Sequence, residues 1–452
     1  MKKCFLCKVK ELKYIILFLA FLKLADVYSQ THSISGIISD KSNNEPLPFV
    51  QVTALGTNCA CISNIEGKFT LKCSKPITEI KITCIGYESS TLNVGDKQYL
   101  KINLSPSDKL LEEVTVVPGI NPADIIMKNV YEKRDKNNPE KSVSFSYMNY
   151  NKLYFTAQLD SSIANNPDKF AQLDTSSQKA VDFLDKHYIF LTESITERKY
   201  MLSAKKNKET VLASRVSGFK NPLFSILATQ LQSFTFYNDF ISLGSVEYHG
   251  IISKNATDKY LFLIQDTSVN TNNDTTIRIT FRPFKNKSFK GMQGSIWINK
   301  ADYAIEQVVA EPYDDMSKSS MHIKINQLYE KIENTQWFPV QLNSRIYLKG
   351  ITIQSPNFMP YGVCNSYIKH IKINPPVKRN EFNEIEIESG KNIASQTDEF
   401  WNTWRGDSLS EKEQKTYHVI DSISDKENLE KKVERYSALL NGKIPLGYFT
   451  ID

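Results

Sequence analysis

A long region of alternating polar and apolar residues, from Ser142 to Asn374, most constrains how this chain can fold. The alternation is visible in runs such as YLFLIQD, TTIRITFRPF, SMHIKINQLYEKI and WFPVQLNSRIYL. A period of two places every second side chain on the same side of an extended strand, so that one face of each strand can be buried. The region therefore predicts a large antiparallel β-sheet.

One run within this region predicts a hairpin. In GSIWINKADYAIEQVVA, residues 299–302 form a polar loop between two alternating strands. The apolar side chains on either side of this loop are Ile296, Ile298, Tyr303, Ile305 and Val308. A helix is expected to interrupt the sheet at NPLFSILATQLQSF, residues 221–234, because Asn221 is a suitable N-cap and Pro222 suits the first helical position.

Seven short β runs between residues 34 and 105 predict a separate β-sandwich. They are SISGIIS, PFVQVTAL, NCACIS, KFTLKC, EIKITCIG, ESSTLNV and QYLKINL, with turn residues between them. The apolar positions expected to face the sandwich core are Phe49, Val52, Leu55, Ile80, Ile82 and Cys84. Gly67 is expected in a tight turn that needs a positive φ, before Phe69 turns inward.

Helices are expected before and after the large sheet region in the sequence. Asn121 and Pro122 are suited to begin a helix whose inward face carries Ala123, Ile126, Met127 and Val130. Near the end of the chain, Ser410 and Glu413 form a capping box, which predicts a helix that contains Tyr417 and Ile420. A second C-terminal helix is expected from Leu429, Val433, Tyr436 and Leu440, with Asn441 and Gly442 at its end.

The first 29 residues have the features of a secretory signal. A lysine-rich start precedes the apolar run YIILFLAFL, and a plausible cleavage site follows VYS. This segment holds six Lys against Glu11 and Asp26, so removing it lowers the formal net charge of +6 to near +2. A mature chain without clustered basic residues is not expected to bind nucleic acid.

Five cysteines follow the signal: Cys59, Cys61, Cys73, Cys84 and Cys364. The odd number leaves at least one thiol unpaired if only intrachain bridges form. Cys73 and Cys84 lie at alternating β positions, which favours small core residues over a bridge between them. The spacings contain no C-x-x-C pair and therefore do not indicate a zinc site.

Catalytic motifs were sought and not found. None of the six histidines begins an H-x-x-E pattern, and only His418 has an acid, Asp421, at the third place after it. The chain contains no G-x-S-x-G elbow and no phosphate-binding glycine loop. We therefore predict a protein that is not an enzyme, with no catalytic, cofactor-binding or metal-binding residues and no cofactor.

Two short motifs are interpreted as structural. The RGDS sequence at residues 405–408 matches an integrin-binding tetrapeptide, but we interpret it as a loop before a helix. The glycosylation sequon at Asn255 is not interpreted as a functional site.

The front module resembles the carboxypeptidase-regulatory-like domain, a transthyretin-like sandwich that is common on exported proteins of Bacteroidetes. The resemblance rests on Gly36, Asp40, residues 46–50, Gly56, Asn64, Gly67, Phe69, Gly86 and Tyr87. Such modules occur beside peptidases and at the front of TonB-dependent transporters. In those transporters a segment similar to LEEVTVV, residues 111–117, precedes a plug domain, but here a helix follows, which favours a plain linker.

The predicted sheet resembles that of periplasmic lipoprotein-carrier proteins, in which a curved half-barrel wraps an apolar cavity. This likeness implies a lipid or acyl chain in the concavity of the sheet. The alternative is a sheet closed on its own helix.

The order of the segments resembles a Bacteroidetes family of outer-membrane-associated proteins, known only as a domain of unknown function. The segments that carry this resemblance include FWNTWRGDSLSEKEQKTY and LLNGKIPLGYF. In that family a barrel-like half follows, so this chain is expected to be a truncated form or a fragment. The expected divisions are a signal at 1–29, the sandwich at 31–106, a linker and helix at 107–141, the antiparallel β domain at 142–378, a helical segment at 379–443 and the start of the barrel-like region at 444–452.

The sequence therefore predicts a mainly β protein with a seven-stranded sandwich, a large antiparallel sheet and a C-terminal helical hairpin. We expect a non-catalytic cell-envelope protein in the periplasm or on the periplasmic face of the outer membrane, with a binding or assembly role and envelope proteins as partners. Carriage of a lipid or lipoprotein is one alternative. An accessory module of a carboxypeptidase or of TonB-dependent transport is another.

Overall fold

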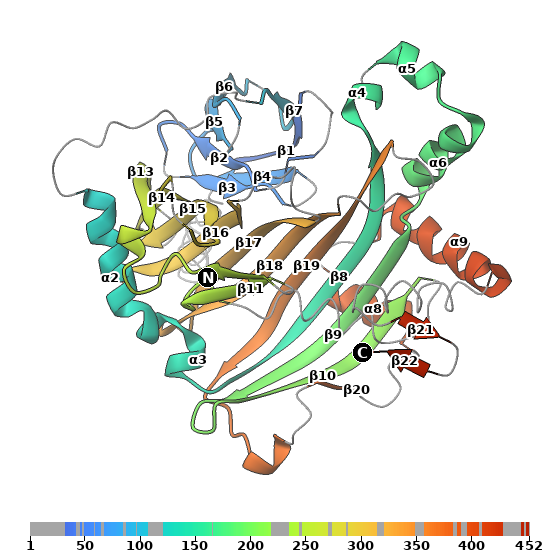
Figure 1. Cartoon of the computed structure of the whole chain (residues 1–452). Helices are drawn as coiled ribbons and strands as arrows, with labels where there is room; N and C mark the ends of the chain where they lie inside the picture. Colours follow the sequence, from blue (N-terminus) through green and yellow to red (C-terminus); the bar gives the residue numbers. More distant parts are fainter. Residues whose placement is uncertain are drawn as a thin grey trace, which may run out of the picture.

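The computed structural model covers the sandwich, the large sheet and the helices around them (Figure 1). It describes residues 32–106, 121–217, 235–313, 321–348, 357–389, 396–427 and 444–451, apart from short gaps at 42–45, 48, 58, 65–66, 85–86, 96, 165, 244–245, 270–273, 286–287, 314–320, 383–386, 406–408 and 447–448. Four predictions fall outside the described residues: the signal peptide, the segment 111–117, the helix at 221–234 and the helix at 429–442.

The N-terminal module is a β-sandwich of seven strands, as predicted. Its strands are β1 (His32–Asp40), β2 (Gln51–Ala54), β3 (Ala60–Ile62), β4 (Lys68–Cys73), β5 (Glu79–Thr83), β6 (Ser90–Asn93) and β7 (Tyr99–Leu104). One sheet has the order β4-β1-β7 and the other β3-β2-β5-β6. Gly67 has the expected positive φ of 72°, and a Cβ at this position would lie 2.4 Å from the Ile38 carbonyl oxygen.

The pattern of apolar residues in the sandwich was predicted only in part. Val52, Ile80 and Ile82 are buried in its core, and Cys84 packs against that core while partly buried. Leu55 is 37% exposed because it lies in the turn after β2. Phe49 has a φ of 63°, and its side chain packs with residues of the large sheet instead of the sandwich core.

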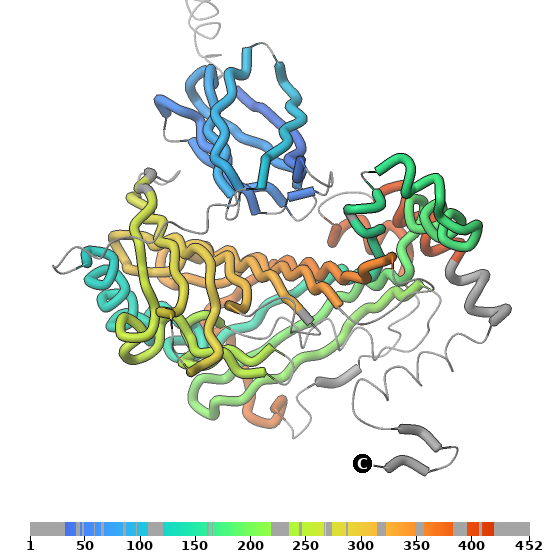
Figure 2. The backbone as a smooth tube through the Cα atoms, turned by 45° about the horizontal axis from the view of Figure 1, so that its top comes forward, coloured from blue at the N-terminus to red at the C-terminus, as the bar shows by residue number. Residues whose placement is uncertain are grey.

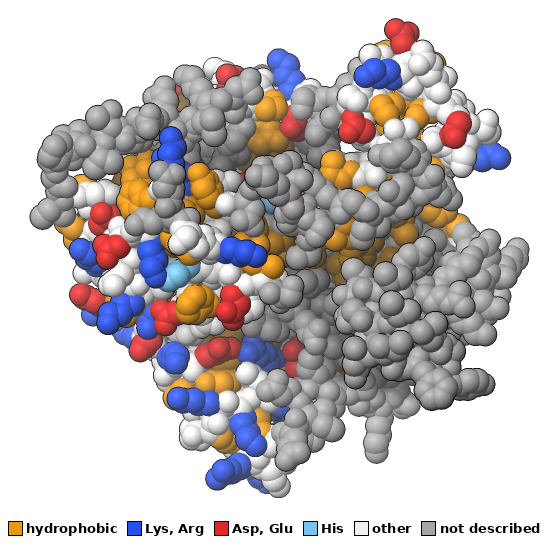
Figure 3. Space-filling model, viewed as in Figure 1, with side chains coloured by type: hydrophobic (Ala, Val, Ile, Leu, Met, Phe, Trp, Pro, Cys, Tyr) orange, Lys and Arg blue, Asp and Glu red, His pale blue; other side chains and the backbone are white. Residues whose placement is uncertain are grey.

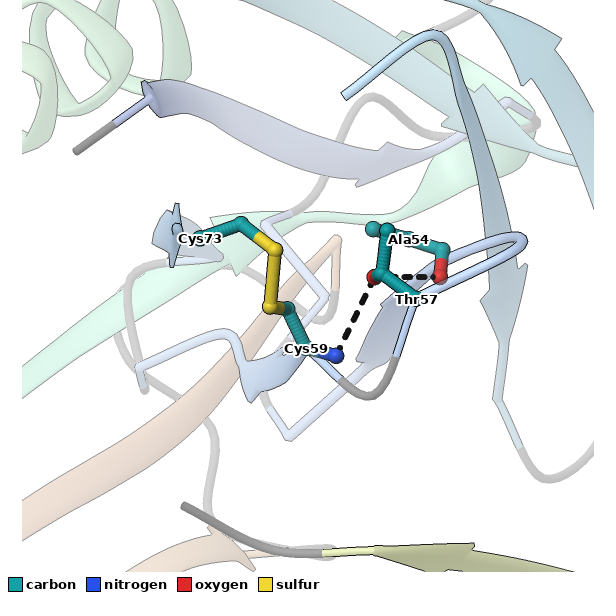
Figure 4. The surroundings of a disulfide bond; sticks show 4 residues. All are labelled: Ala54, Thr57, Cys59 and Cys73. Atoms are coloured by element: carbon teal, nitrogen blue, oxygen red, sulfur yellow. Dashed lines mark hydrogen bonds between the residues drawn. A yellow bond between two sulfur atoms is a disulfide. The ribbon is translucent and has the colours of Figure 1, made fainter. Parts of the chain in front are cut away.

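A disulfide joins Cys59 to Cys73, so the prediction that Cys73 is a reduced core residue was wrong (Figure 4). The two Cα atoms lie 5.7 Å apart, since Cys59 precedes β3 at the point where β4 ends beside it. The amide of Cys59 also donates to Oγ1 of Thr57 at 3.2 Å. Cys73 therefore packs in the core and also forms the bridge.

An eleven-stranded sheet forms the centre of the molecule and confirms the predicted antiparallel sheet (Figure 1). Its order is β13-β14-β15-β16-β17-β18-β19-β8-β9-β10-β20, and only the pairing of β10 with β20 is parallel. The strands are β8 (Phe145–Leu159), β9 (Phe190–Met201), β10 (Lys206–Val216), β13 (Tyr260–Val269), β14 (Thr275–Pro283), β15 (Met292–Asn299), β16 (Ala304–Pro312), β17 (Met321–Ile332), β18 (Gln336–Leu348), β19 (Phe358–Ile373) and β20 (Ile387–Ser389).

Two short hairpins and several helices accompany the sheet. The hairpins are β11 (Phe240–Leu243) with β12 (Val246–His249), and β21 (Ile444–Leu446) with β22 (Phe449–Ile451). The β21–β22 hairpin lies in the segment 444–452, where the start of a barrel-like region is expected. The helices are α2 (Pro122–Asn137), α3 (Pro139–Ser142), α4 (Ser161–Ala164), α5 (Pro167–Ala171), α6 (Thr175–Lys186), α8 (Asp398–Trp404) and α9 (Glu411–Glu427). None of the described helices is long and apolar enough to cross a membrane.

One face of the large sheet, which we call the helix face, packs against α2 and the β11–β12 hairpin. Helix α2 begins as predicted, because Oδ1 of Asn121 accepts from the amide of Ala123 at 3.1 Å. Met127 and Val130 are buried in the same apolar cluster as Ile296 and Ile305 of the sheet. The hairpin between β15 and β16 also has the predicted place and polar loop.

The opposite face, which we call the sandwich face, carries the sandwich and the helices α8 and α9. An apolar cluster joins Phe49 of the sandwich, Trp297 and Leu191 of the sheet, and Tyr417 of α9. Figure 2 shows the sandwich lying over this face of the sheet. The predicted capping box of α9 is present, since Ser410 and Glu413 exchange hydrogen bonds between their side chains and backbone amides.

A buried carboxylate ties α8 and α9 to the sheet. Glu193 on β9 is fully buried, and both of its oxygens accept from the guanidinium of Arg405, at 2.6 and 2.5 Å. The hydroxyls of Tyr150 and Tyr417 donate to the same carboxylate at 2.6 and 2.9 Å. Arg405 is the arginine of the RGDS motif, and its side chain is only 4% exposed. It therefore supports the sheet and is not presented to a receptor, which agrees with our structural interpretation of this motif.

A second carboxylate on the sandwich face has a shifted pKa. Nε2 of His322 lies 3.3 Å from Oε2 of Glu311, and Nε2 of Gln293 donates to its other oxygen at 3.0 Å. Burial alone would raise the pKa of Glu311. The hydrogen bond with His322 and the positive charge of Lys324 outweigh burial and lower this pKa from 4.5 to about 2.

Replacing Arg405 by Met is expected to destabilise the protein by about 3–5 kcal/mol, because the change leaves the Glu193 carboxylate buried without its cation. Urea unfolding measures this free energy. The matched control is Lys186→Met, which removes an ion pair with Asp182 whose side chains are 51% and 67% exposed. That control should change stability far less, because solvent screens an exposed ion pair. Equal effects of the two substitutions would show that the buried pair does not hold α8 and α9 in place.

The lowered pKa of Glu311 predicts a stability contribution that depends on pH. The folded state favours the ionised carboxylate. Its contribution to stability is therefore present above pH 4.5 and is lost as the pH falls toward 2. Urea unfolding of wild type and Glu311→Gln should therefore show a stability difference near pH ~6 that shrinks toward pH ~3. The control is Glu88→Gln, at an exposed position. A difference for Glu311→Gln that stays constant with pH would contradict this account.

Candidate functional site

The contact between the sandwich and the sheet begins at a turn that Ser63 holds in place. The buried hydroxyl of Ser63 donates to the Leu47 carbonyl and accepts from the Val50 amide, both at 2.9 Å. These bonds fix the left-handed residue Phe49 between them, so that its ring is directed at the large sheet. There it packs in one cluster with Trp297 and Val309.

Two arginines of the sheet contact the sandwich beside this cluster. Nη1 of Arg278 on β14 donates to Oγ1 of Thr83 at 3.5 Å. Nη1 of Arg345 on β18 donates to the Pro46 carbonyl at the same distance. The sandwich therefore meets the sheet through both apolar and polar contacts, all near the end of the sandwich where Gln51 pairs with Thr83.

A cavity of about 740 Å³ lies next to this contact. Residues of β2, β3 and the turn after β3 form one wall, and residues of β14 to β18 form the other. The volume falls within the range of about 300–1,000 Å³ that is typical of small-molecule sites. Because the walls come from both parts of the protein, the cavity depends on the position of the sandwich.

Side-chain amides dominate the polar part of the sheet wall. Nε2 of Gln307 donates to Oδ1 of Asn326 at 2.8 Å, which orients both amides beside the cavity. Asn343 also lines the cavity and is only 2% exposed, and its Oδ1 accepts no hydrogen bond from the described residues. A buried acceptor of this kind is normally satisfied by water or a ligand.

Of the two glutamates in the cavity lining, Glu306 is already hydrogen-bonded, whereas Glu330 is exposed. Glu306 accepts from Oγ1 of Thr276 at 2.5 Å and from Nδ2 of Asn299 at 3.0 Å. The ammonium of Lys331 lies 2.7 Å from Asp302, so its charge is neutralised within the protein. The site therefore presents mainly uncharged polar groups.

The sequence did not lead us to predict any of these lining residues. Gln307, Asn326 and Asn343 occupy polar positions of the alternation, and no motif marks them as a binding site. The structure shows that the sandwich lies above them. The one available signal was the amide-rich composition of these positions, since an ordinary solvent face is richer in Lys and Glu.

Charged side chains do not single out another site. In the part of the chain that the structure describes, no three His, Cys, Asp or Glu side chains lie together as a metal site requires. On the face shown in Figure 3, basic and acidic side chains are interspersed among the described residues. The predicted lipid site stays a prediction; among the described residues, α2 and the β11–β12 hairpin cover the part of the helix face that β13 to β18 form.

Comparison with protein-family models gives two matches. Residues 34–116 match the CarboxypepD_reg-like domain, and residues 126–357 match a family of unknown function, DUF5686. Neither description names a catalytic activity. A comparison with curated proteins found no match.

Solved structures give only distant similarity. A DUF1329 family protein from Desulfovibrio piger is 10% identical with a TM-score of 0.26, and the alignment covers 59% of this chain and 98% of that one. Lipovitellin is 8% identical with a TM-score of 0.23, over 52% of this chain and 26% of that one. In the MucA/MucB complex of Pseudomonas aeruginosa, the matched chain is 8% identical with a TM-score of 0.17, over 56% of this chain and 99% of that one. Similarity at this level identifies neither a ligand nor an activity.

The two family matches confirm the resemblance found in the sequence. The second match spans about half of the chain and most of the large sheet. This chain therefore belongs to the family of unknown function DUF5686 and has a carboxypeptidase-regulatory-like domain before the family region.

Proposed function

We propose that this chain is an exported, non-catalytic protein of the cell envelope that binds a small polar ligand between its sandwich and its large sheet. The observation that carries the proposal is the cavity of about 740 Å³ with walls from both parts. Pockets formed where two domains meet are a common place for ligands. The domain boundary thus has a role beyond linking two folded modules.

Binding fits the chemistry of the cavity better than catalysis does. A general acid or base needs a titratable group that is available to the substrate. Glu306 instead accepts hydrogen bonds from Thr276 and Asn299, and Asp302 is engaged with Lys331 and with the indole of Trp337. The lining groups left to contact a ligand are mainly amides and rings, together with the exposed carboxylate of Glu330.

The envelope location is supported by two independent features. The first 29 residues have the pattern of a secretory signal. The bond between Cys59 and Cys73 is the kind of disulfide that persists in an oxidising compartment such as the periplasm. We place the protein in the periplasm or on the periplasmic face of the outer membrane, with envelope proteins as partners.

Expression of the full chain in a Gram-negative host tests both parts of the proposal. The protein should lose residues 1–29, begin at Gln30, and fractionate with the cell envelope or periplasm. Native mass spectrometry of the purified protein should then show a small molecule retained from the envelope. In Gln307→Trp, which fills the cavity, the retained mass should be lost because the ligand has no room.

The control is Gln265→Trp, at an exposed position on β13 outside the cavity, which should keep the retained mass. An uncleaved protein in the cytosol would contradict the envelope location. Absence of a retained molecule in wild type, or retention that Gln307→Trp does not change, would contradict the binding site. Bound zinc together with hydrolysis of C-terminal residues from peptides would contradict the non-catalytic role.

A further inference from the structure

The amides around the cavity match a ligand that is rich in hydroxyl groups. The lining contains Gln51, Asn64, Gln307, Asn326, Gln341 and Asn343, which come from both walls. Each amide side chain offers both donors and an acceptor, and each hydroxyl does the same. A set of amides can therefore bond to neighbouring hydroxyls whichever way each hydroxyl points.

Asn343 marks one position in the cavity where a ligand hydroxyl could bond to an amide. Its carboxamide is buried beside the cavity, and Oδ1 accepts no hydrogen bond from the described residues, so it needs a donor from a ligand or a water. Asn365 lies opposite Asn343 across the β18–β19 pair, is 3% exposed, and also has an Oδ1 without a bond from the described residues. Only Asn343 lines the cavity.

The charges of the lining disfavour an anionic ligand. Among the described lining residues, Lys331 is the only cation, and its ammonium is held by Asp302 at 2.7 Å. Glu306 and Glu330 lie in the same lining. A phosphate or carboxylate ligand would therefore enter a site without a matching positive charge.

Aromatic rings stand on both walls. Phe49 comes from the sandwich and Trp297 from β15 of the sheet, and both line the cavity. The C–H faces of sugar rings are apolar and pack against aromatic rings, while the sugar hydroxyls bond to polar groups around the edge. The lining offers both kinds of contact.

The sheet wall does not offer the backbone groups that an extended peptide would use. Strands β15, β16 and β17 are each paired on both sides, so their amides and carbonyls already bond within the sheet. Peptides that add a strand need a free sheet edge. Strand β3 of the sandwich does stand at the edge of its own sheet, so a peptide is the rival that the experiment must separate.

We infer that the ligand of this cavity is a short neutral oligosaccharide, bound through the amides of the sheet wall between Phe49 and Trp297. This inference rests on the proposed binding function and specifies the ligand class. Asn343 is assigned as a specificity residue, because its Oδ1 accepts a hydrogen bond from a sugar hydroxyl.

Isothermal titration of the full mature chain with cellotriose, maltotriose and triacetylchitotriose tests the inference. At least one of these sugars should bind wild type. Asn343→Leu should weaken that binding about tenfold or more, since a buried hydrogen bond to the ligand is lost. Asn365→Leu is the matched control and should stay within about twofold of wild type. Thermal unfolding of both variants checks that they fold, and Gln307→Leu replaces Asn343→Leu if the latter does not.

Two further probes, an uncharged hexapeptide and phosphatidylglycerol vesicles, test whether the cavity binds a peptide or a lipid instead of a sugar. Binding of either one that depends on Asn343, with no sugar bound, would overturn the sugar assignment but leave the proposed binding function intact. Equal loss in Asn343→Leu and Asn365→Leu would also overturn the assignment. If no sugar binds and native mass spectrometry finds no retained molecule, both this inference and the proposed function fail.

Discussion

A sheet of eleven strands has two broad faces, and the need to cover both of them determines how this molecule is built. Strands with alternating apolar side chains are stable only when at least one face is removed from water. Helix α2 and the β11–β12 hairpin cover the part of the helix face formed by β13 to β18 with a continuous apolar cluster. The sandwich face is covered in pieces, by the sandwich at one end and by α8 and α9 at the other. The cavity lies on the sandwich face, between the sandwich and the sheet.

Different interactions hold the two kinds of cover in place. The apolar cluster on the helix face needs no specific partner for any one side chain, and its stability follows from buried area. On the sandwich face, the buried ion pair of Glu193 and Arg405 fixes the segment of α8 and α9 to the sheet. Such interactions are directional, so they determine where a covering element lies. A binding site between two modules requires this kind of fixed position.

Much of the fold could be predicted from the sequence because its signals are local. Period-two alternation predicted the large sheet and the hairpin before Tyr303, and the caps at Asn121 and Ser410 predicted where helices begin. The errors came from contacts between distant segments. Phe49 fits an inward position of the sandwich, but Ser63 holds its turn so that it packs on the sheet. Cys73 satisfies the pattern of a core residue, and only the position of β3 shows that it bonds to Cys59.

The cavity could not be predicted for a related reason. An alternating pattern distinguishes the apolar side of a strand from the polar side, but it does not tell whether another module covers the polar side. The amides of Gln307, Asn326 and Asn343 therefore look like solvent-facing residues until the sandwich is placed above them. In the same way, the RGDS motif gives no sign that Arg405 pairs with a glutamate more than two hundred residues earlier in the chain.

The sandwich and the sheet form one unit through the cluster that contains Phe49 and Trp297, and the cavity lies beside that cluster. A double-mutant cycle tests this directly, using the free energies of urea unfolding of Phe49→Ala, Trp297→Ala and the double variant. Residues in contact are coupled, so we predict an interaction energy of about 0.5–3 kcal/mol between these two positions. Strictly additive effects, with no interaction energy, would show that the two rings do not pack together and would contradict the account.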